Sequence, residues 1–151
     1  MKRFYFVSTI AVVASSLLAF SASAEQSGVM HDGAIMGGLV VPEMDPVEGR
    51  RLFASKGCVV CHSINGVGGT DAPNLDASTM AMPMDPFSFA AKMWQGAPAM
   101  IAMQETELGA QIQFTGQELA DIIAFVHDPA EQKSFSEADI PENIKEHMEV
   151  D

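Results

Sequence analysis

Cys58-Val59-Val60-Cys61-His62 (CVVCH) is the stretch of the chain on which both the fold and the chemistry depend. The two thiols are separated by two valines, and an imidazole follows directly. This C-x-x-C-H pattern is the attachment signature for c-type haem. Two thiols at this spacing can add across the two vinyl groups of a porphyrin, and the histidine is then placed to bind the iron. We therefore expect one covalent haem c on Cys58 and Cys61, with His62 as an iron ligand.

Two other uses of a C-x-x-C pair were weighed against haem attachment. A thioredoxin-like redox pair needs a strand-helix-strand context, and the flanking sequence is not strand-like. A zinc site needs two further ligands, but the chain has no other cysteine, and its remaining histidines are scattered. A structural disulfide across so short a loop would remove little chain entropy. Haem attachment is therefore favoured.

The N-terminus has the features of an export signal. Lys2 and Arg3 precede a mostly apolar run, and Ala22-Ser23-Ala24 has the small-x-small form of a cleavage site. The sequence predicts a signal peptide over residues 1–24, cleaved near Ala24, and a periplasmic mature protein. The alternative is an uncleaved membrane anchor, for which the run is short and diluted by serines.

The charge of the chain limits its partners. The sequence has 8 basic and 20 acidic side chains, a formal charge of −12. This excludes nucleic acid, which requires a basic surface, and predicts membrane contact only through a partner complex. We expect redox protein partners with a basic docking patch, although the charge is equally consistent with a role in solubility alone.

Three helices are predicted from their ends and their periodicity. Asp45-Pro46 opens the first, which ends at Gly57. Asp85-Pro86 opens the second, and we expect Gly96 and Pro98 to stop it near Trp94, with a short helical piece over 99–107. The third opens at Thr115, where Glu118 completes a capping box, and ends at Asp128-Pro129.

The segments around these helices define the predicted domain organisation. Residues 25–44 are glycine-rich and are interpreted as a loose N-terminal arm, and residues 63–83 as a loop. The domain itself is placed at 45–128. Residues 129–151 form an acidic C-terminal tail, which is either a strap over the domain or a frayed end.

Over about residues 45–128 the chain resembles the class I (mono-haem) c-type cytochrome family. The resemblance rests on CVVCH, on the opening helix with Gly49 and Phe53, on the segment 72–75 (APNL), and on a Trp-bearing helix followed by methionine and a closing helix with Phe125. It implies an all-α, small cytochrome c fold, with helices wrapped around one covalently attached haem. Gly49 and Phe53 would meet the Phe125 face where the first and last helices cross.

The same resemblance implies roles for individual residues. The Pro73 carbonyl would accept a hydrogen bond from His62, and Trp94 would donate its indole N–H to a haem propionate. A methionine sulfur would be the sixth iron ligand, and Met100 is favoured because residues 94–100 look like the Trp-to-ligand loop of the family. Met103 and the early cluster of Met80, Met82 and Met84 remain alternatives.

We expect a soluble one-electron carrier with His/Met ligation that shuttles electrons between redox partners in a respiratory or dehydrogenase chain. We do not expect an enzyme, because the side chains outside the motif form no nucleophile–base arrangement. One alternative is a haem-based sensor or binder with an open sixth site. Another is a tightly held electron-transfer subunit of a larger complex.

Overall fold

The computed structural model describes residues 35–83 and 85–148, all of which belong to one compact unit, His31–Asp151. The predicted signal peptide, residues 25–34 of the predicted arm, and Met84 lie outside the described residues. Within this part of the chain, no helix is long and apolar enough to cross a membrane.

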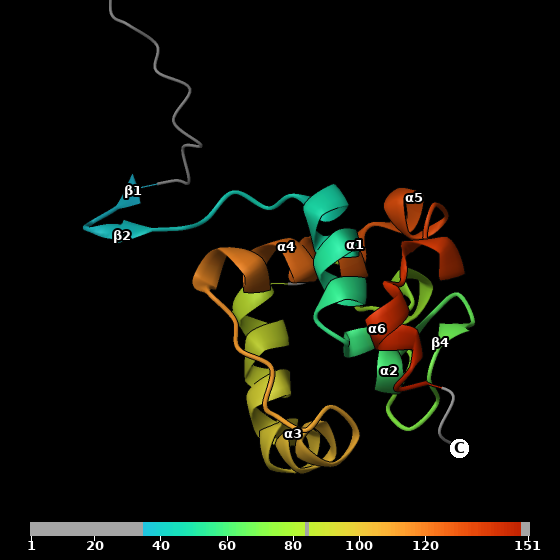
Figure 1. Cartoon of the computed structure of the whole chain (residues 1–151). Helices are drawn as coiled ribbons and strands as arrows, with labels where there is room; N and C mark the ends of the chain where they lie inside the picture. The colour runs from blue at the N-terminus through green and yellow to red at the C-terminus, as the bar shows by residue number, and fades with distance from the viewer. Residues whose placement is uncertain (1–34, 84, 149–151) are drawn as a thin grey trace, which may run out of the picture. The chain divides into compact units, whose positions relative to one another are not determined.

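The described residues are mostly helical, which confirms the expected all-α class (Figure 1). Two short antiparallel hairpins are the only strands in this part of the chain. In order, the elements are β1 (Ile35–Met36), β2 (Leu39–Val40), α1 (Pro46–Ser55), α2 (Cys58–Cys61), β3 (Ser63–Ile64), β4 (Val67–Gly68), η1 (Ala77–Thr79), α3 (Pro86–Glu107), α4 (Gly116–His127), α5 (Pro129–Gln132), η2 (Glu137–Asp139) and α6 (Glu142–Lys145). The β3–β4 hairpin and η1 lie within the segment predicted as a loop.

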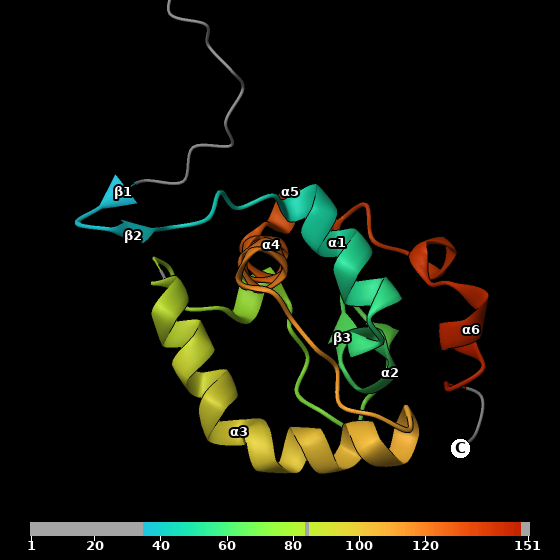
Figure 2. The same cartoon turned by 60° about the vertical axis from the view of Figure 1, so that its left-hand side comes forward.

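Helices α1 and α4 cross and pack closely, as the family resemblance implied (Figures 1 and 2). Gly49 makes the approach possible, because a Cβ atom there would lie 1.9 Å from the Asp121 carbonyl oxygen. The rings of Phe53 and Phe125 lie beside the crossing, with their centroids 5.7 Å apart. The crossing of α1 and α4 is therefore a tightly packed interface within the domain.

The predicted helix ends are present at α1 and α4. Asp45 Oδ1 accepts hydrogen bonds from the backbone N–H groups of Val47 and Glu48, at 2.9 and 3.1 Å. At α4, Thr115 Oγ1 accepts from Glu118 N, and Glu118 Oε2 accepts from Thr115 N, so the capping box is complete. These caps satisfy N–H groups that have no partner inside their helices.

The prediction that Gly96 and Pro98 stop the second helix is wrong. Helix α3 runs unbroken for 22 residues, with Pro98 inside it. Proline removes one N–H and leaves the Trp94 carbonyl without its usual helical partner, which bends this helix rather than ending it. Figure 2 shows α3 changing direction along its length. The bend lets one helix follow two sides of the domain.

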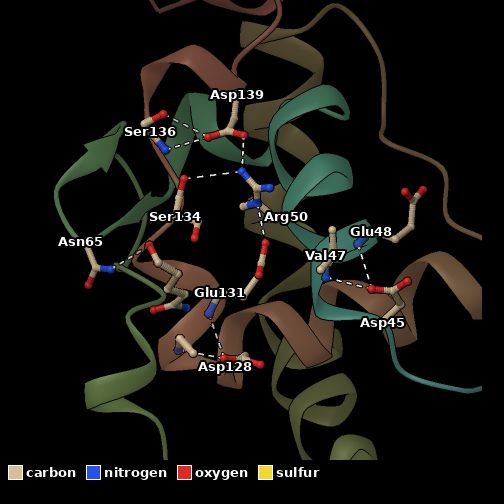
Figure 3. A network of polar contacts seen from close by, with 12 residues as sticks. Asp45, Val47, Glu48, Arg50, Asn65, Asp128, Glu131, Ser134, Ser136 and Asp139 are labelled. Carbon is tan, nitrogen blue, oxygen red and sulfur yellow. Dashed lines mark hydrogen bonds and ion pairs between the residues drawn. The ribbon is translucent and has the colours of Figure 1, made fainter.

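The tail over residues 129–148 packs as a strap rather than fraying. Phe135, Ile140 and Ile144 are buried in the core, and the Phe135 ring lies 5.6 Å from that of Phe53. Arg50 of α1 holds the strap through its guanidinium, which pairs with Glu131 and Asp139 (Figure 3). The folded domain therefore extends past the predicted boundary at residue 128.

A buried glutamine links this strap to the loop after α2. The Gln132 amide donates to the carbonyls of Leu75 and Phe125, at 2.9 and 3.3 Å, and its Oε1 accepts from Ala77 N at 2.8 Å. These three hydrogen bonds use both N–H donors of the amide and one lone pair of its oxygen. Gln132 therefore holds the loop that follows His62 in place.

Candidate functional site

The attachment motif forms a single helical turn, α2, directly after Gly57. Gly57 has φ +85°, a conformation that favours glycine, and it redirects the chain from α1 into α2. Val59 and Val60 are buried in the core and hold the turn in place. Cys58 and Cys61 are both free thiols and both line the same cavity.

The environment of the two thiols argues against a thiol–disulfide redox centre. Burial raises the pKa of the Cys58 thiol to about 12. Burial also raises the pKa of Cys61, and the carboxylates of Asp71 and Glu107 add to that effect. Redox-active thiols need a lowered pKa, because the thiolate is the attacking species. Both thiols face the cavity, as attachment to a porphyrin bound there would require.

His62 is oriented by the loop that follows it. Its Nδ1 lies 2.7 Å from the Pro73 carbonyl oxygen, so the contact implied by the family resemblance is present. A carbonyl can only accept, so Nδ1 donates, and in the neutral imidazole the lone pair is then on Nε2. His62 also lines the cavity, and the imidazole is thus held in the tautomer that a metal ligand requires.

The loop reaches Pro73 by passing close beneath α2. Gly69 N donates to the Val59 carbonyl at 2.9 Å, and Ala72 N donates to the Cys61 carbonyl at 3.0 Å. A Cβ atom on Gly69 would lie only 1.8 Å from the Val60 carbonyl oxygen. Glycine is therefore required at this position, and its close approach places the Pro73 carbonyl against His62.

The cavity in front of α2 has a volume of about 640 Å³. It is lined mainly by apolar side chains from α1, α3, α4 and the loops between them. On α3 the lining residues recur every three or four positions, which marks one face of the helix. They are Phe89, Lys92, Met93, Gly96, Ala99, Met100, Met103 and Gln104.

The structure brings most of the candidate methionines to this cavity. Met100 and Met103 line it from α3, together with Met93, and Met80 lines it from the loop after η1. Met82 is 71% exposed and is not among the lining residues. Three methionines on one helical face thus line the same cavity as His62.

The structure does not bring Trp94 to the cavity. Trp94 is 80% exposed. Phe87, which lies seven residues earlier on the same outer face of the helix, is 70% exposed. The reason is the continuous α3 helix, in which Met93 takes the inward position and its neighbour is turned outward. The expected contact between Trp94 and a haem propionate has no support in this geometry.

Two polar residues of the lining were not predicted from the sequence. Gln104 is buried, and its Oε1 accepts a hydrogen bond from Ile112 N at 2.9 Å, so its NH₂ group is turned away from that contact. Lys92 is the one lysine or arginine among the cavity-lining residues. Lys92 lies eight residues before Met100 on the same helical face, and the predicted break in α3 concealed that relation. Gln104 lies four residues after Met100, within the helical piece predicted over 99–107.

A family model for Cytochrome c matches residues 46–128, which is 83 of the 151 residues. The chain belongs to the cytochrome c family. This agrees with the all-α fold and with the attachment motif, and it implies a covalent haem c and a role in electron transfer. The comparisons with curated proteins and with solved structures found no match.

The cavity of this cytochrome fits a covalently attached haem. Its volume is within the range of about 300–1,000 Å³ that is usual for small-molecule sites, and its walls are mostly apolar. Cys58, Cys61 and His62 all face it, and the free Nε2 of His62 offers the lone pair that iron needs. The residues that would hold the group are therefore all in place around one space.

Proposed function

We propose that this protein is a soluble, exported one-electron carrier with one haem c and His/Met ligation, rather than an enzyme. The observation that carries the proposal is that His62, with its Nε2 free, shares one apolar cavity with the methionine face of α3. The haem supplies the reversible one-electron step, and the protein sets its ligands and surroundings.

Met100 is the sixth ligand that we propose. It lies two residues after Pro98, on the face of α3 that lines the same cavity as His62. Met103 lies one turn further on the same face and Met93 two turns earlier. Thioether sulfur is a soft donor that raises the reduction potential of the iron, which suits an electron carrier.

The optical spectrum of the haem-loaded protein tests this proposal. We expect a low-spin ferric form with a methionine-to-iron charge-transfer band and no carbon monoxide binding to the ferrous form. Met100→Ala should abolish the band, whereas the matched variant Met103→Ala should keep it. A high-spin spectrum with ready carbon monoxide binding in the unmutated protein would favour the alternative, a haem-based sensor or binder with an open sixth site.

We also propose export to the periplasm and docking on partners with a basic patch. The support is the predicted signal over residues 1–24 and the excess of acidic side chains, 20 against 8 basic. N-terminal sequencing of the protein recovered from the periplasm of an expressing cell tests the first part. A mature chain that begins near Glu25 is expected, and an intact Met1 would contradict export with cleavage.

A further inference from the structure

The haem cavity is almost free of compensating positive charge. Its lining includes one carboxylate, Asp71, and one lysine, Lys92, among otherwise uncharged side chains and His62. A haem brings two propionate carboxylates into this space, and carboxylates near apolar walls need a cation or hydrogen-bond donors. Trp94, the donor that the family resemblance implied, is not among the residues that line the cavity.

The other described cations of the domain are engaged elsewhere or face away. Arg50, Arg51, Lys56 and Lys145 each pair with a carboxylate, and none of them lines the cavity. Lys133 is exposed on the strap segment, outside the cavity. Within the described residues, no carboxylate lies within ion-pair distance of Lys92, so its ammonium group is available to an incoming anion.

Lys92 also lies on the correct side of the cavity. Thioether bonds to Cys58 and Cys61 would hold the vinyl-bearing edge of a porphyrin at α2, and its propionates would then lie away from α2. Both views show the first half of α3 and α2 on different sides of the domain (Figures 1 and 2). Lys92 is in that first half, between Phe89 and Met93 on the inward face.

We infer that Lys92 forms an ion pair with a haem propionate and is a positioning residue that raises the reduction potential of the iron. This rests on the proposed haem-carrying function. A cation beside the haem favours the ferrous state, because that state carries one positive charge less than the ferric state. The long lysine stem lets the ammonium reach the propionate while its carbons cover the cavity edge.

Potentiometric titration of the haem-loaded protein tests the inference. Lys92→Gln should lower the midpoint potential, and Lys92→Arg should restore it. Lys133→Gln removes the same charge outside the cavity and should leave the potential unchanged. The shift in Lys92→Gln should shrink at high ionic strength, because an exposed pair is screened by salt. An equal effect of the two glutamine variants, or no effect of either, would overturn the role of Lys92.

A failure of the proposed function has a different signature. In that case the unmutated protein would carry no covalently bound haem after denaturing electrophoresis, and no potential could be assigned. Where all three variants keep covalent haem and an unchanged ligand spectrum, a lower potential in Lys92→Gln alone is assigned to the charge at position 92. The two ideas are therefore tested separately by the same preparation.

Discussion

At the scale of single residues, Gln104 connects the cavity wall to the loop after α3. Its Oε1 accepts a hydrogen bond from the Ile112 N–H at 2.9 Å. This contact fixes the orientation of the amide, because only its oxygen can accept. Gln104 is four residues after Met100, so the two side chains are neighbours on the helix. A change at Gln104 therefore affects both the loop and the surroundings of the proposed ligand.

Gln104→Leu should destabilise the haem-loaded protein. The substitution leaves the Ile112 N–H without its acceptor, which costs about 1–3 kcal/mol when the group is shielded from water. Gln111→Leu removes an exposed glutamine from the neighbouring loop and should change the stability little. Urea unfolding followed by circular dichroism measures both, and equal midpoints in the two variants would contradict a structural role for the Gln104 amide.

How well a site residue could be predicted depends on how much of the chain determines its position. The placement of Cys58, Cys61 and His62 follows from five consecutive residues, and the Pro73 contact follows from a short loop. The direction of Trp94 depends instead on whether α3 continues past Pro98. Local sequence favours a break there, but the helix continues through Pro98 and changes direction instead of ending.

At the scale of the elements, the α1–α4 crossing depends on a missing side chain. Gly49→Ala should destabilise the protein by about 1–3 kcal/mol, the usual cost of overpacking, because its Cβ would collide with the Asp121 carbonyl. Gly116→Ala is the matched control, since nothing lies within 4 Å of a Cβ at that position. Thermal unfolding of both variants gives the comparison, and a tolerant Gly49 would show that the helices can move apart.

The cap of α4 makes part of the stability depend on pH. Hydrogen bonds from Lys56 and from Thr115 lower the pKa of Glu118 below its ordinary value of 4.5. Because the folded pKa is the lower one, the contribution is fully present above about pH 4.5 and is lost as the pH falls through the folded value. Glu118→Gln should thus be less stable than the unmutated protein at neutral pH.

The difference between Glu118→Gln and the unmutated protein should narrow as the pH falls through the acid range. Unfolding midpoints measured at several pH values between neutral and acid follow this change. Glu105→Gln removes an exposed carboxylate from α3 and serves as the control for a general charge effect. A constant difference across the range would mean that the Glu118 charge does not act through the cap.

At the scale of the whole molecule, the core extends beyond the segment that matches the family. Phe135 packs against Phe53 and Phe125, with ring centroids 5.6 and 5.7 Å apart. Phe135→Ala should cost about 3–5 kcal/mol, as for other buried phenylalanines. Phe87→Ala, on the exposed outer face of α3, should cost far less. If denaturant unfolding finds the two equal, the strap is not part of the core.

The acidic surface predicts how the protein meets a partner. Electron transfer to a protein with a basic docking patch should slow as the ionic strength rises, because screening weakens the attraction that guides the encounter. Stopped-flow rates with a basic redox protein at increasing salt measure this effect, and an uncharged small oxidant is the control. A rate that rises with salt would contradict the proposed partner chemistry.

The bridge formed by Gln132 also sets an order of events while the protein is being made. Synthesis starts at the N-terminus, so Cys61 is finished 71 residues before Gln132 (132 minus 61). Until that glutamine arrives, the loop that orients His62 lacks the hydrogen bonds to Leu75 and Ala77. The loop around His62 can therefore reach its final form only once the C-terminal strap has folded back onto the domain.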